Sequence, residues 1–400
     1  MKICRVIYDW PPPWDGLAPH PYELTVSQTS LGHEVHVLCG RWPSAGKLEV
    51  PEGVQVYPIF REPFQGTIAF TSSILVFFKY LSWRRKNKDV EIIHSHGHFG
   101  MWIYGYRLFL QKFFPWAEDL KVPLVMHFHN TVQGRWEKMQ KEGKYIMPHS
   151  KYIAWPLALL ADKWAVKTAA ACIFVSKDTA TEAQKFYKVD PRRCFIVESG
   201  VNPSRFIRVG QEERNKGRTE LGFDLYDKVI LNYGMMVERK NIHVLVESLA
   251  YLPLQYKLLL VGQWPDGAYT NVVDEIIRTK NLASRIVKVG YTPYPQIPIA
   301  LQNADIFVLP SSWEGLPKVV VESLAVGLPC LVSGFTMKEE VKGVSYISKI
   351  DAKEVAEGIL KIFSGPMTVD ANKVIHEYSW DRRAREIEGV YDFAKKNYLA

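Results

Sequence analysis

The chain has 400 residues, of which 47% are hydrophobic and 23% are charged, and this composition is typical of a globular protein. A chain of this length exceeds one ordinary hydrophobic core, so we expect two domains and exclude a disordered or fibrous protein. The net charge of +8 indicates anionic partners, and the phosphates of a nucleotide, a nucleic acid or an anionic membrane would each qualify.

The five cysteines are an odd set without a CxxC pair, so they predict reduced thiols in the core rather than disulfides or a metal site. This cysteine usage favours the cytoplasm. The first residues, MKICRVIYDWPPP, lack the long apolar region of a secretory signal. The uncharged stretch at 63–78 is shorter than the roughly 20 residues that cross a bilayer, so we expect no membrane span.

Short strand-like runs alternate with helical patterns through the first half of the chain, as in a parallel βαβ sheet. The expected strands cover residues 2–10, 34–39, 91–96, 123–129, 171–176 and 194–200. Helices are expected at 21–33, 68–83, 156–171 and 179–187, with one more between the third and fourth strands.

A polar segment at 208–227 interrupts this alternation and is interpreted as an interdomain linker. The same rhythm then starts again. Strands are expected at 229–235, 257–262, 285–291 and 305–311, and helices at 241–252, 271–282 and 295–304. The sequence therefore predicts two doubly wound α/β domains, and two such domains facing each other would form a cleft.

Ligands of doubly wound sheets bind at the carboxyl ends of the strands, so the residues just after each strand are the candidates for chemistry. The segments in question are 9–20, 94–100, 127–131, 234–241, 262–264, 290–294 and 311–318.

Two glutamates surround the end of the last of these segments. Glu314 precedes an expected helix start at Pro317, and Glu322 lies inside that apolar helix, about 12 Å further along at ~1.5 Å per residue. This separation excludes a single acid/base pair and favours contacts with separate parts of one long ligand. Its phosphates would rest on free amides of the helix start, such as those of Leu316 and Lys318. The alternative is structural, with Glu314 facing the helix dipole and Glu322 bonded to a backbone amide.

The run Glu314-GLPKVVV-Glu322, with Ala325, Gly327 and Pro329 behind it, resembles the motif of the retaining glycosyltransferase family 4 group. The resemblance extends through nearly the whole chain. It implies the GT-B architecture, an α/β fold of two Rossmann-like domains.

The resemblance also implies how the chain is divided. Residues 1–207 would form an acceptor domain and 208–379 a nucleotide-sugar domain, and the helix at 380–400 would pack back on the first domain.

By position in the family motifs, Glu314 would approach the hydroxyls of the donor hexose, Glu322 would bind the ribose, and His129 would face the donor sugar. The expected catalytic residues are His129, Lys240 and Glu314, and the expected nucleotide-sugar contacts are Gly16, Gly234, Arg239, Lys240, Gly290, Tyr291, Gly315, Leu316, Lys318 and Glu322.

Three positions depart from the family pattern. Asp15 replaces the first glycine of the glycine-rich loop, and Ser199 replaces a usual asparagine. Met235 stands where the phosphate loop normally has an arginine, so either Arg239 supplies the missing charge or Lys240 holds the phosphates alone. Cations at a helix start oppose its dipole, which indicates an anion near them.

Histidines alternate at two expected strand ends, in IIHSHGHFG (His94, His96 and His98) and in VMHFHNT (His127 and His129). In extended chain each set points to one side. A zinc or iron site is one interpretation, but no carboxylate or cysteine completes either set. The family resemblance gives the simpler role of sugar contact, and it implies that no metal and no cofactor beyond the donor is needed.

Lys79, Arg84, Arg85, Lys86 and Lys88 follow an apolar helix. They fit an anionic membrane surface carrying a lipid-linked acceptor. The alternative is a solvated helix end whose cations suit the dipole. Nucleic acid is not expected, because basic and acidic residues are interspersed and no recognition motif is present.

The sequence therefore predicts a cytoplasmic retaining enzyme that moves a hexose from a UDP- or GDP-type sugar to a lipid-linked, polyol or glycan hydroxyl. Trp10 and Trp14 in the first loop are candidates for stacking on the acceptor. The alternatives are a GT-B epimerase or phosphorylase, and a two-domain binding protein without turnover.

Overall fold

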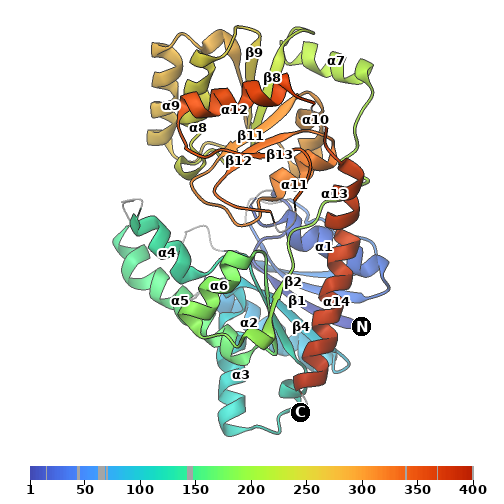
Figure 1. The fold of residues 1–400 in the computed structure, drawn as a ribbon. Helices are drawn as coiled ribbons and strands as arrows, with labels where there is room; N and C mark the ends of the chain where they lie inside the picture. The colour runs from blue at the N-terminus through green and yellow to red at the C-terminus, as the bar shows by residue number, and fades with distance from the viewer. Residues whose placement is uncertain are drawn as a thin grey trace. The chain divides into compact units, whose positions relative to one another are not determined.

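The computed structural model describes residues 1–14, 16–42, 46–61, 68, 71–141, 147–337, 340–366 and 368–398. Its contacts divide the chain into two units. Unit 1 contains Met1–Ser199 and the chain from Trp380 onward, and unit 2 contains Gly200–Ser379. Each unit is an α/β sandwich around its own parallel sheet (Figure 1).

Unit 1 is built on seven parallel strands in the order β3-β2-β1-β4-β5-β6-β7. The central strands β1, β4 and β5 are buried along almost their whole length because helices cover both faces of the sheet. The strands are β1 (Lys2–Ile7), β2 (Glu34–Arg41), β3 (Val54–Phe60), β4 (Ile92–His96), β5 (Leu124–Phe128), β6 (Ala171–Phe174) and β7 (Cys194–Ile196).

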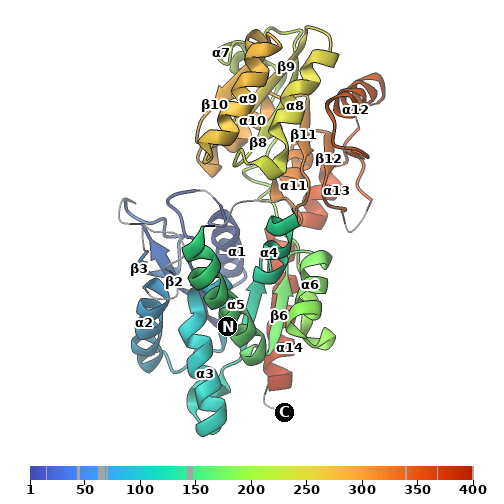
Figure 2. The same cartoon turned by 90° about the vertical axis from the view of Figure 1, so that its left-hand side faces the viewer.

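Helices α2, α3, α5 and α6 share one core with the first face of the sheet, while α1 and α14 share a second core with the other face (Figure 2). In the second core, Trp380, Ile387 and Tyr391 of α14 are buried against the sheet. The helices are α1 (Pro19–Ser30), α2 (Ser72–Lys86), α3 (Met101–Phe113), α4 (Val132–Lys141), α5 (Trp155–Thr168), α6 (Lys177–Tyr187) and α14 (Trp380–Tyr398).

Unit 2 repeats the plan with six parallel strands in the order β10-β9-β8-β11-β12-β13. Helices α8, α9 and α12 share one core with the sheet, and α11 packs against α13. The strands are β8 (Lys228–Tyr233), β9 (Tyr256–Val261), β10 (Ile286–Val289), β11 (Ile306–Pro310), β12 (Cys330–Ser333) and β13 (Val344–Tyr346). The helices are α7 (Gln211–Glu220), α8 (Ile242–Ser248), α9 (Gly267–Thr279), α10 (Ile297–Gln302), α11 (Lys318–Ala325), α12 (Ala352–Ser364) and α13 (Ala371–Tyr378).

The structure corrects two expectations about elements. The segment 208–227 is not a linker, because it contains α7, whose Arg214 and Arg218 form ion pairs with Asp305 at 2.5 and 2.6 Å. Strand β3 was not predicted, and its internal Pro58 is tolerated because β3 is the edge strand of the sheet.

Two further sequence expectations concern membranes and thiols. None of the helices in the described part of the chain is both long and apolar enough to cross a bilayer. All five cysteines are free, and four of them are buried. Part of the uncharged stretch at 63–78, including residues 63–67, 69 and 70, lies outside the described residues.

Candidate active site

The strand order of unit 2 reverses between β8 and β11, which makes this place the topological switch point of the sheet. Ligands of open α/β sheets bind at such a point. The chain leaves β8 through Gly234, whose φ of +119° belongs to the region that glycine tolerates. A Cβ at Gly262, after β9, would collide with the carbonyl oxygen of Gly234. The two glycines therefore allow the backbones after β8 and β9 to approach each other closely.

The loops after β8 and β11 are held together by Asn241 and Ser312. Asn241 Nδ2 donates to the carbonyl oxygen of Pro310 at 2.8 Å and to Ser312 Oγ at 3.0 Å. The Ser312 amide donates to the carbonyl oxygen of Arg239 at 2.8 Å. These hydrogen bonds hold the segment that contains Arg239 and Lys240 beside Glu314.

Glu314 forms an ion pair with Arg239 and accepts a hydrogen bond from Ser311 Oγ at 3.0 Å. Its backbone amide donates to the carbonyl oxygen of Gly334 at 2.8 Å. Arg239 also donates to the carbonyl oxygen of Trp313 at 3.2 Å. Arg239 thus orients the carboxylate of Glu314, and the sequence did not predict this role.

Lys240 is buried, and a Cβ built on Gly234 would lie 2.6 Å from its Nζ atom. Burial lowers the pKa of Lys240 to about 8, Glu314 opposes this shift, and Arg239 and Lys318 add to it. Three cations and one carboxylate therefore gather at this point, and their net positive charge favours an anionic ligand.

The start of α11 faces the same strand ends. Lys318 is its first residue, and Pro317, which precedes it, makes no side-chain cap hydrogen bond. Gly315 is half-buried and Leu316 is buried in the turn before the helix. The Nζ atom of Lys318 lies 4.4 Å from the centre of the Tyr294 ring. An uncapped helix start with a lysine beside it is suited to a phosphate.

Glu322 is fully buried within α11 and accepts a hydrogen bond from the hydroxyl of Tyr233. Burial and the neighbouring Glu322 raise the pKa of Tyr233 well above its usual range, so the hydroxyl stays protonated. Tyr233 directly precedes Gly234, which joins the second glutamate of the motif to the glycine loop. The sequence reasoning missed Tyr233, and its only signal was its place at a strand end.

The other expected contacts of unit 2 lie at its surface. Gly290 and Tyr291 follow β10, the edge strand, and both are exposed. Met235 is also exposed, at 47%. The structure thus brings Gly234, Arg239, Lys240, Glu314 and the start of α11 together, with Gly290 and Tyr291 on the sheet edge two strands from β8.

Unit 1 holds the remaining predicted residues. Gly16 is exposed and has a φ of +53°, while its neighbour Asp15 lies outside the described residues. Trp10 is not a stacking platform, because its ring is 2% exposed and its Nε1 donates to the carbonyl oxygen of Glu49 at 2.8 Å. Trp14 is half-buried and packs edge-on against Tyr22.

His129 belongs to a group of stacked imidazoles on β4 and β5. His94 and His127 approach through their ring nitrogens at 3.2 Å, and His96 and His129 do so at 3.1 Å. All four rings lie within about 21° of parallel with their neighbours. The alternating spacing in the sequence correctly places His94 with His96, and His127 with His129, on one face of the sheet. His98 does not join them, because the chain turns into a short helix at Gly97–Gly100.

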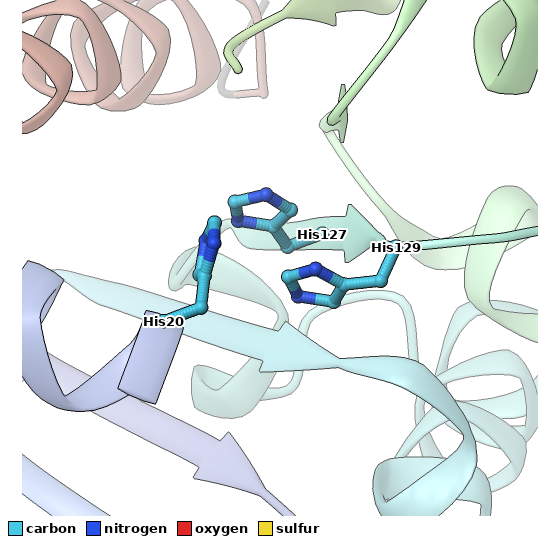
Figure 3. Close-up of side chains that lie close together, drawn as sticks. All are labelled: His20, His127 and His129. Carbon is cyan, nitrogen blue, oxygen red and sulfur yellow. The ribbon is translucent and has the colours of Figure 1, made fainter. Parts of the chain in front are cut away.

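Burial lowers the pKa of His129 to about 3, and it lowers the pKa values of His94, His96 and His127 well below the ordinary value. These imidazoles are therefore neutral at physiological pH. His20 of α1 lies edge-on to His127 and His129 (Figure 3), a neighbour that the sequence did not reveal.

A pocket of about 130 Å³ opens beside this group in unit 1. His96 and His129 line it together with Asp9, His98 and Asp162. Imidazole nitrogens and carboxylate oxygens are suitable partners for hydroxyl groups, so the pocket is polar where a hydroxylated ligand would need hydrogen bonds.

Two family models match the chain in succession. The model described as Glycosyltransferase Family 4 matches residues 14–205, and the model described as Glycosyl transferases group 1 matches residues 213–381. The glutamates, Lys240 and Gly234 lie in the second match, and the histidines lie in the first.

Two related proteins are also named as enzymes that transfer sugars. An uncharacterized glycosyltransferase of Methanocaldococcus jannaschii is 25% identical over 98% of this chain and 98% of its own length. The Escherichia coli UDP-Gal:alpha-D-GlcNAc-diphosphoundecaprenol alpha-1,3-galactosyltransferase is 27% identical, over 58% of this chain and 63% of its own length.

Solved structures share the fold. Sucrose-phosphate synthase from Thermosynechococcus elongatus superposes with a TM-score of 0.77 at 18% identity, covering 98% of both chains. Anabaena HepE in complex with UDP-glucose superposes with a TM-score of 0.72 at 14% identity, covering 97% of this chain and 98% of that one. The two parallel sheets and these neighbours identify the GT-B fold.

Proposed function

Since the chain belongs to the glycosyltransferases of the family 4 group, we propose that it transfers a hexose from a nucleotide diphosphate sugar to a hydroxyl acceptor, with retention of configuration. The observation that carries this proposal is the cationic site at the β8/β11 switch point, where Lys240, Lys318 and the uncapped start of α11 meet Glu314. The structure of HepE with UDP-glucose supports a nucleotide-sugar donor.

In this mechanism the bond between the anomeric carbon and the diphosphate breaks through an oxocarbenium-like state, and the electron pair leaves with the diphosphate. The acceptor hydroxyl oxygen forms the new bond to the same carbon, and its proton passes to the departing diphosphate. Lys240 Nζ and the amides at the start of α11 stabilise the negative charge that develops on the leaving diphosphate. These groups are fixed before the reaction, so no reorganisation opposes charge development. Lys240, Lys318 and Arg239 provide the positive charge, and we propose that turnover needs no metal ion and continues in the presence of a chelator.

The remaining residues orient the donor. The family resemblance assigns Glu314 and His129 to the hexose, Glu322 to the ribose, and Gly290 with Tyr291 to the edge of the base. Glu322 would reach the ribose by exchanging its bond with Tyr233. Gly16 lies in the glycine-rich loop and is assigned to the donor by the same resemblance.

The pocket beside His96 and His129 is the proposed acceptor site. Its carboxylates and imidazoles fit a hydroxylated ligand. The neutral imidazoles of His96 and His129 can accept a hydrogen bond from a hydroxyl without adding a positive charge next to a cationic transition state. The free cysteines favour a reducing compartment, and we place the reaction in the cytoplasm.

A thermal-shift screen with UDP, GDP, ADP and their hexose conjugates tests donor binding. A ligand that binds only the folded protein raises the melting temperature by mass action. We expect a shift with one nucleotide class. No shift with any of them, on protein that melts cooperatively, would contradict the proposed donor site.

Glu314→Ala separates chemistry from nucleotide binding. Glu314 is expected to orient the hexose rather than the nucleotide, so the variant should keep the nucleotide-induced shift and lose transfer by about 10²-fold or more. Transfer is measured by product formation with the donor found in the screen. Unaltered turnover would refute the role of Glu314, and Glu340→Ala, a substitution in the same unit away from the β8 and β11 loops, is the control.

We further propose that the end of α2 binds an anionic membrane. Phe109, Phe113, Phe114 and Trp116 at the end of α3 are all exposed, and Trp116 is 73% exposed. They form a chain of ring contacts at 5.0 to 6.0 Å. Exposed aromatic rings of this number are unusual on a protein surface facing water, and they suit the headgroup region of a bilayer.

The basic end of α2 lies beside these rings. Arg84 Nε forms an ion pair with Asp119 at 3.0 Å, just after Trp116, and α2 and α3 run side by side in both views (Figures 1 and 2). Arg85, Lys86 and Lys88 are exposed next to them. The named substrate of the Escherichia coli relative, a diphosphoundecaprenol, supports an acceptor carried by such a membrane.

Vesicle sedimentation tests this surface. Binding is expected with phosphatidylglycerol vesicles but not with phosphatidylcholine vesicles, and it should weaken as salt rises. Trp116→Ser should reduce binding, while Tyr226→Ser, at an even more exposed aromatic residue of unit 2, should not. Equal binding to both kinds of vesicle, or none to either, would contradict the proposal.

A further inference from the structure

Three histidines from separate parts of unit 1 meet at one point (Figure 3). His20 comes from the first turn of α1, His127 from β5, and His129 from the residue after that strand. The potential ligand nitrogens of the three all lie within 4.8 Å of one another. His127 and His129 form a His-x-His pair on one side of an extended chain, and His20 stands at right angles to both.

Each of these imidazoles is held by a partner on one of its two nitrogens. His20 Nδ1 lies 3.2 Å from Ser199 Oγ, and His129 Nε2 lies 3.1 Å from His96 Nδ1. His127 Nδ1 lies 3.2 Å from His94 Nε2. Histidine ligands of metals are typically oriented in this way, through a bond from the nitrogen that does not bind the metal.

The second nitrogen of His127 has no such bond. His127 Nε2 is buried and has no hydrogen-bond partner in the described part of the chain. A buried polar atom without a partner is costly, and it is rare in folded proteins. In the tautomer in which His127 Nδ1 donates to His94, the lone pair of Nε2 is available to a metal. His94 Nδ1 then donates to the hydroxyl oxygen of Tyr391, 2.6 Å away.

The charge around the site selects the kind of cation. The three donors are neutral nitrogens, and the guanidinium of Arg5 is close enough to lower the pKa of His127. A cation held mainly by charge, such as Ca²⁺ or Mg²⁺, would be repelled and would lack oxygen ligands. A metal that forms strong bonds to imidazole nitrogen does not need a carboxylate.

We propose that His20, His127 and His129 bind one Zn²⁺-type divalent ion, with the fourth ligand position facing the pocket that His129 lines. Tetrahedral zinc with bonds of about 2.0 to 2.1 Å needs nitrogens about 3.4 Å apart, so the present spacing must shrink by at most about 1.5 Å. His129 is only partly buried and lines the pocket, which supplies the path of entry for the ion.

This site also bears on the proposed transfer reaction. A metal on His129 would remove that imidazole from the donor sugar, so the loaded protein should be inhibited rather than activated. This consequence rests on the proposed function, whereas metal binding itself does not.

The test uses the full chain without a histidine tag, stripped with a chelator and dialysed. We expect one equivalent of Zn²⁺ to bind in calorimetry, and Co²⁺ to give the intense visible absorption of a tetrahedral site. His20→Gln should lower the affinity by at least tenfold. His149→Gln changes an exposed histidine of the same unit that lies outside both the three ligands and the pocket, and it should bind as the unaltered protein does.

X-ray absorption on the unaltered zinc-loaded protein gives a second measurement that needs no variant. Three nitrogen neighbours of imidazole type are expected at about 2.0 to 2.1 Å. Failure of the unaltered protein to bind Zn²⁺ or Co²⁺ overturns the proposal. Full binding by a folded His20→Gln variant overturns the assignment of the three ligands, for example in favour of His94, His96 and His127. Transfer assays are separate, because loss of donor binding would refute the transferase proposal and leave these metal measurements unaffected.

Discussion

Lys240 is held in surroundings that a lysine normally avoids. Its ammonium group is buried beside two other cations, and among the residues that the structure describes Glu314 is the carboxylate that opposes their effect. A buried charge without a close partner destabilises a fold, so such a residue usually has a ligand that completes it. The diphosphate of a nucleotide sugar would complete the charge balance around Lys240.

The lowered pKa of Lys240 makes the reaction sensitive to pH in a stated direction. The amine is charged below about pH 8 and neutral above it. Because the charged form binds the diphosphate, kcat/KM should be level below pH 8 and should fall above it, approaching about tenfold per pH unit. A pH profile of kcat/KM checks this. A profile that stays level to pH 10 would show that Lys240 does not act as the cation.

Replacing the amine of Lys240 should increase the stability of the free protein while it removes nucleotide binding. The folded pKa of about 8 lies below the ordinary lysine pKa of 10.5, so the unfolded chain holds more protons between these values and the free energy of unfolding rises with pH there. Below pH 8 the full penalty remains, on the order of 3 kcal/mol.

Lys240→Met should therefore raise the melting temperature of the free protein at pH 7 by several degrees and abolish the nucleotide-induced shift. Calorimetry at pH 7 and pH 10.5 would show the gain shrinking at the higher pH. Lys361→Met, at an exposed lysine of α12, is the control and should change neither quantity. A destabilised Lys240→Met variant that still binds nucleotide would contradict this account.

The sequence predicted this site in part. The spacing of Glu314 and Glu322 pointed to separate roles, and the order of the strands placed Gly234 and Lys240 near them. It could not predict that Arg239 pairs with Glu314, because the two residues are 75 positions apart and meet only when β8 and β11 become neighbours. It likewise gave no sign that His20 joins the β5 histidines.

At the scale of elements, α7 shows how a polar helix can be part of a domain. Its mean composition resembles a linker, but Arg218 is buried and reaches Asp305 at the start of β11. Asp305 also accepts from the amide of Val229, the second residue of β8, at 2.8 Å. A periodicity search misses such a helix, because its anchors are arginines rather than apolar residues.

Asp305→Asn should destabilise unit 2 strongly. The substitution leaves the buried guanidinium of Arg218 without its carboxylate, and breaking a buried ion pair from one side typically costs about 3 to 5 kcal/mol. Denaturant unfolding measures the loss. Asp274→Asn, whose partner Lys288 lies on the surface, should cost less than about 1 kcal/mol. Equal effects of the two substitutions would show that α7 is not anchored by Asp305.

The edge strand β3 was missed for a different reason. Its run VQVYPIF contains Pro58, which removes a backbone donor and normally argues against a strand. The fold tolerates Pro58 because β3 has a neighbour only on one side. The position of a strand at the edge of a sheet depends on the order of all its strands, so a local sequence pattern cannot predict it.

At the scale of the whole molecule, the repeat of one α/β plan was readable from the alternation of strands and helices. The apolar strands and the helices between them predict parallel sheets, and the paired strands of both sheets are parallel. The alternation of strands and helices does not show which sheet a helix packs on when the chain goes back to the first unit. α14 follows unit 2 in the sequence but forms part of the core of unit 1.

A chain that stops after Ser379 should lose unit 1 and keep unit 2. It lacks the buried side chains of Trp380, Ile387, Val390 and Tyr391, each worth about 1.5 to 3 kcal/mol, and this sum is comparable to the whole stability of a domain. Limited proteolysis should therefore leave a resistant fragment starting near Gly200. The isolated segment 200–379 is the control and should melt cooperatively. A truncated chain in which unit 1 also resists proteolysis would contradict the prediction.

The return of α14 to unit 1 also sets an order of events during synthesis. The ribosome makes unit 2 entirely between the first and the last parts of unit 1, so unit 2 can close its core while one face of the earlier sheet still waits for its covering helix. That face stays only partly covered, by α1, until α14 emerges. The newborn chain is thus most exposed to aggregation and to chaperones before α14 has been made, in the unit that was begun first.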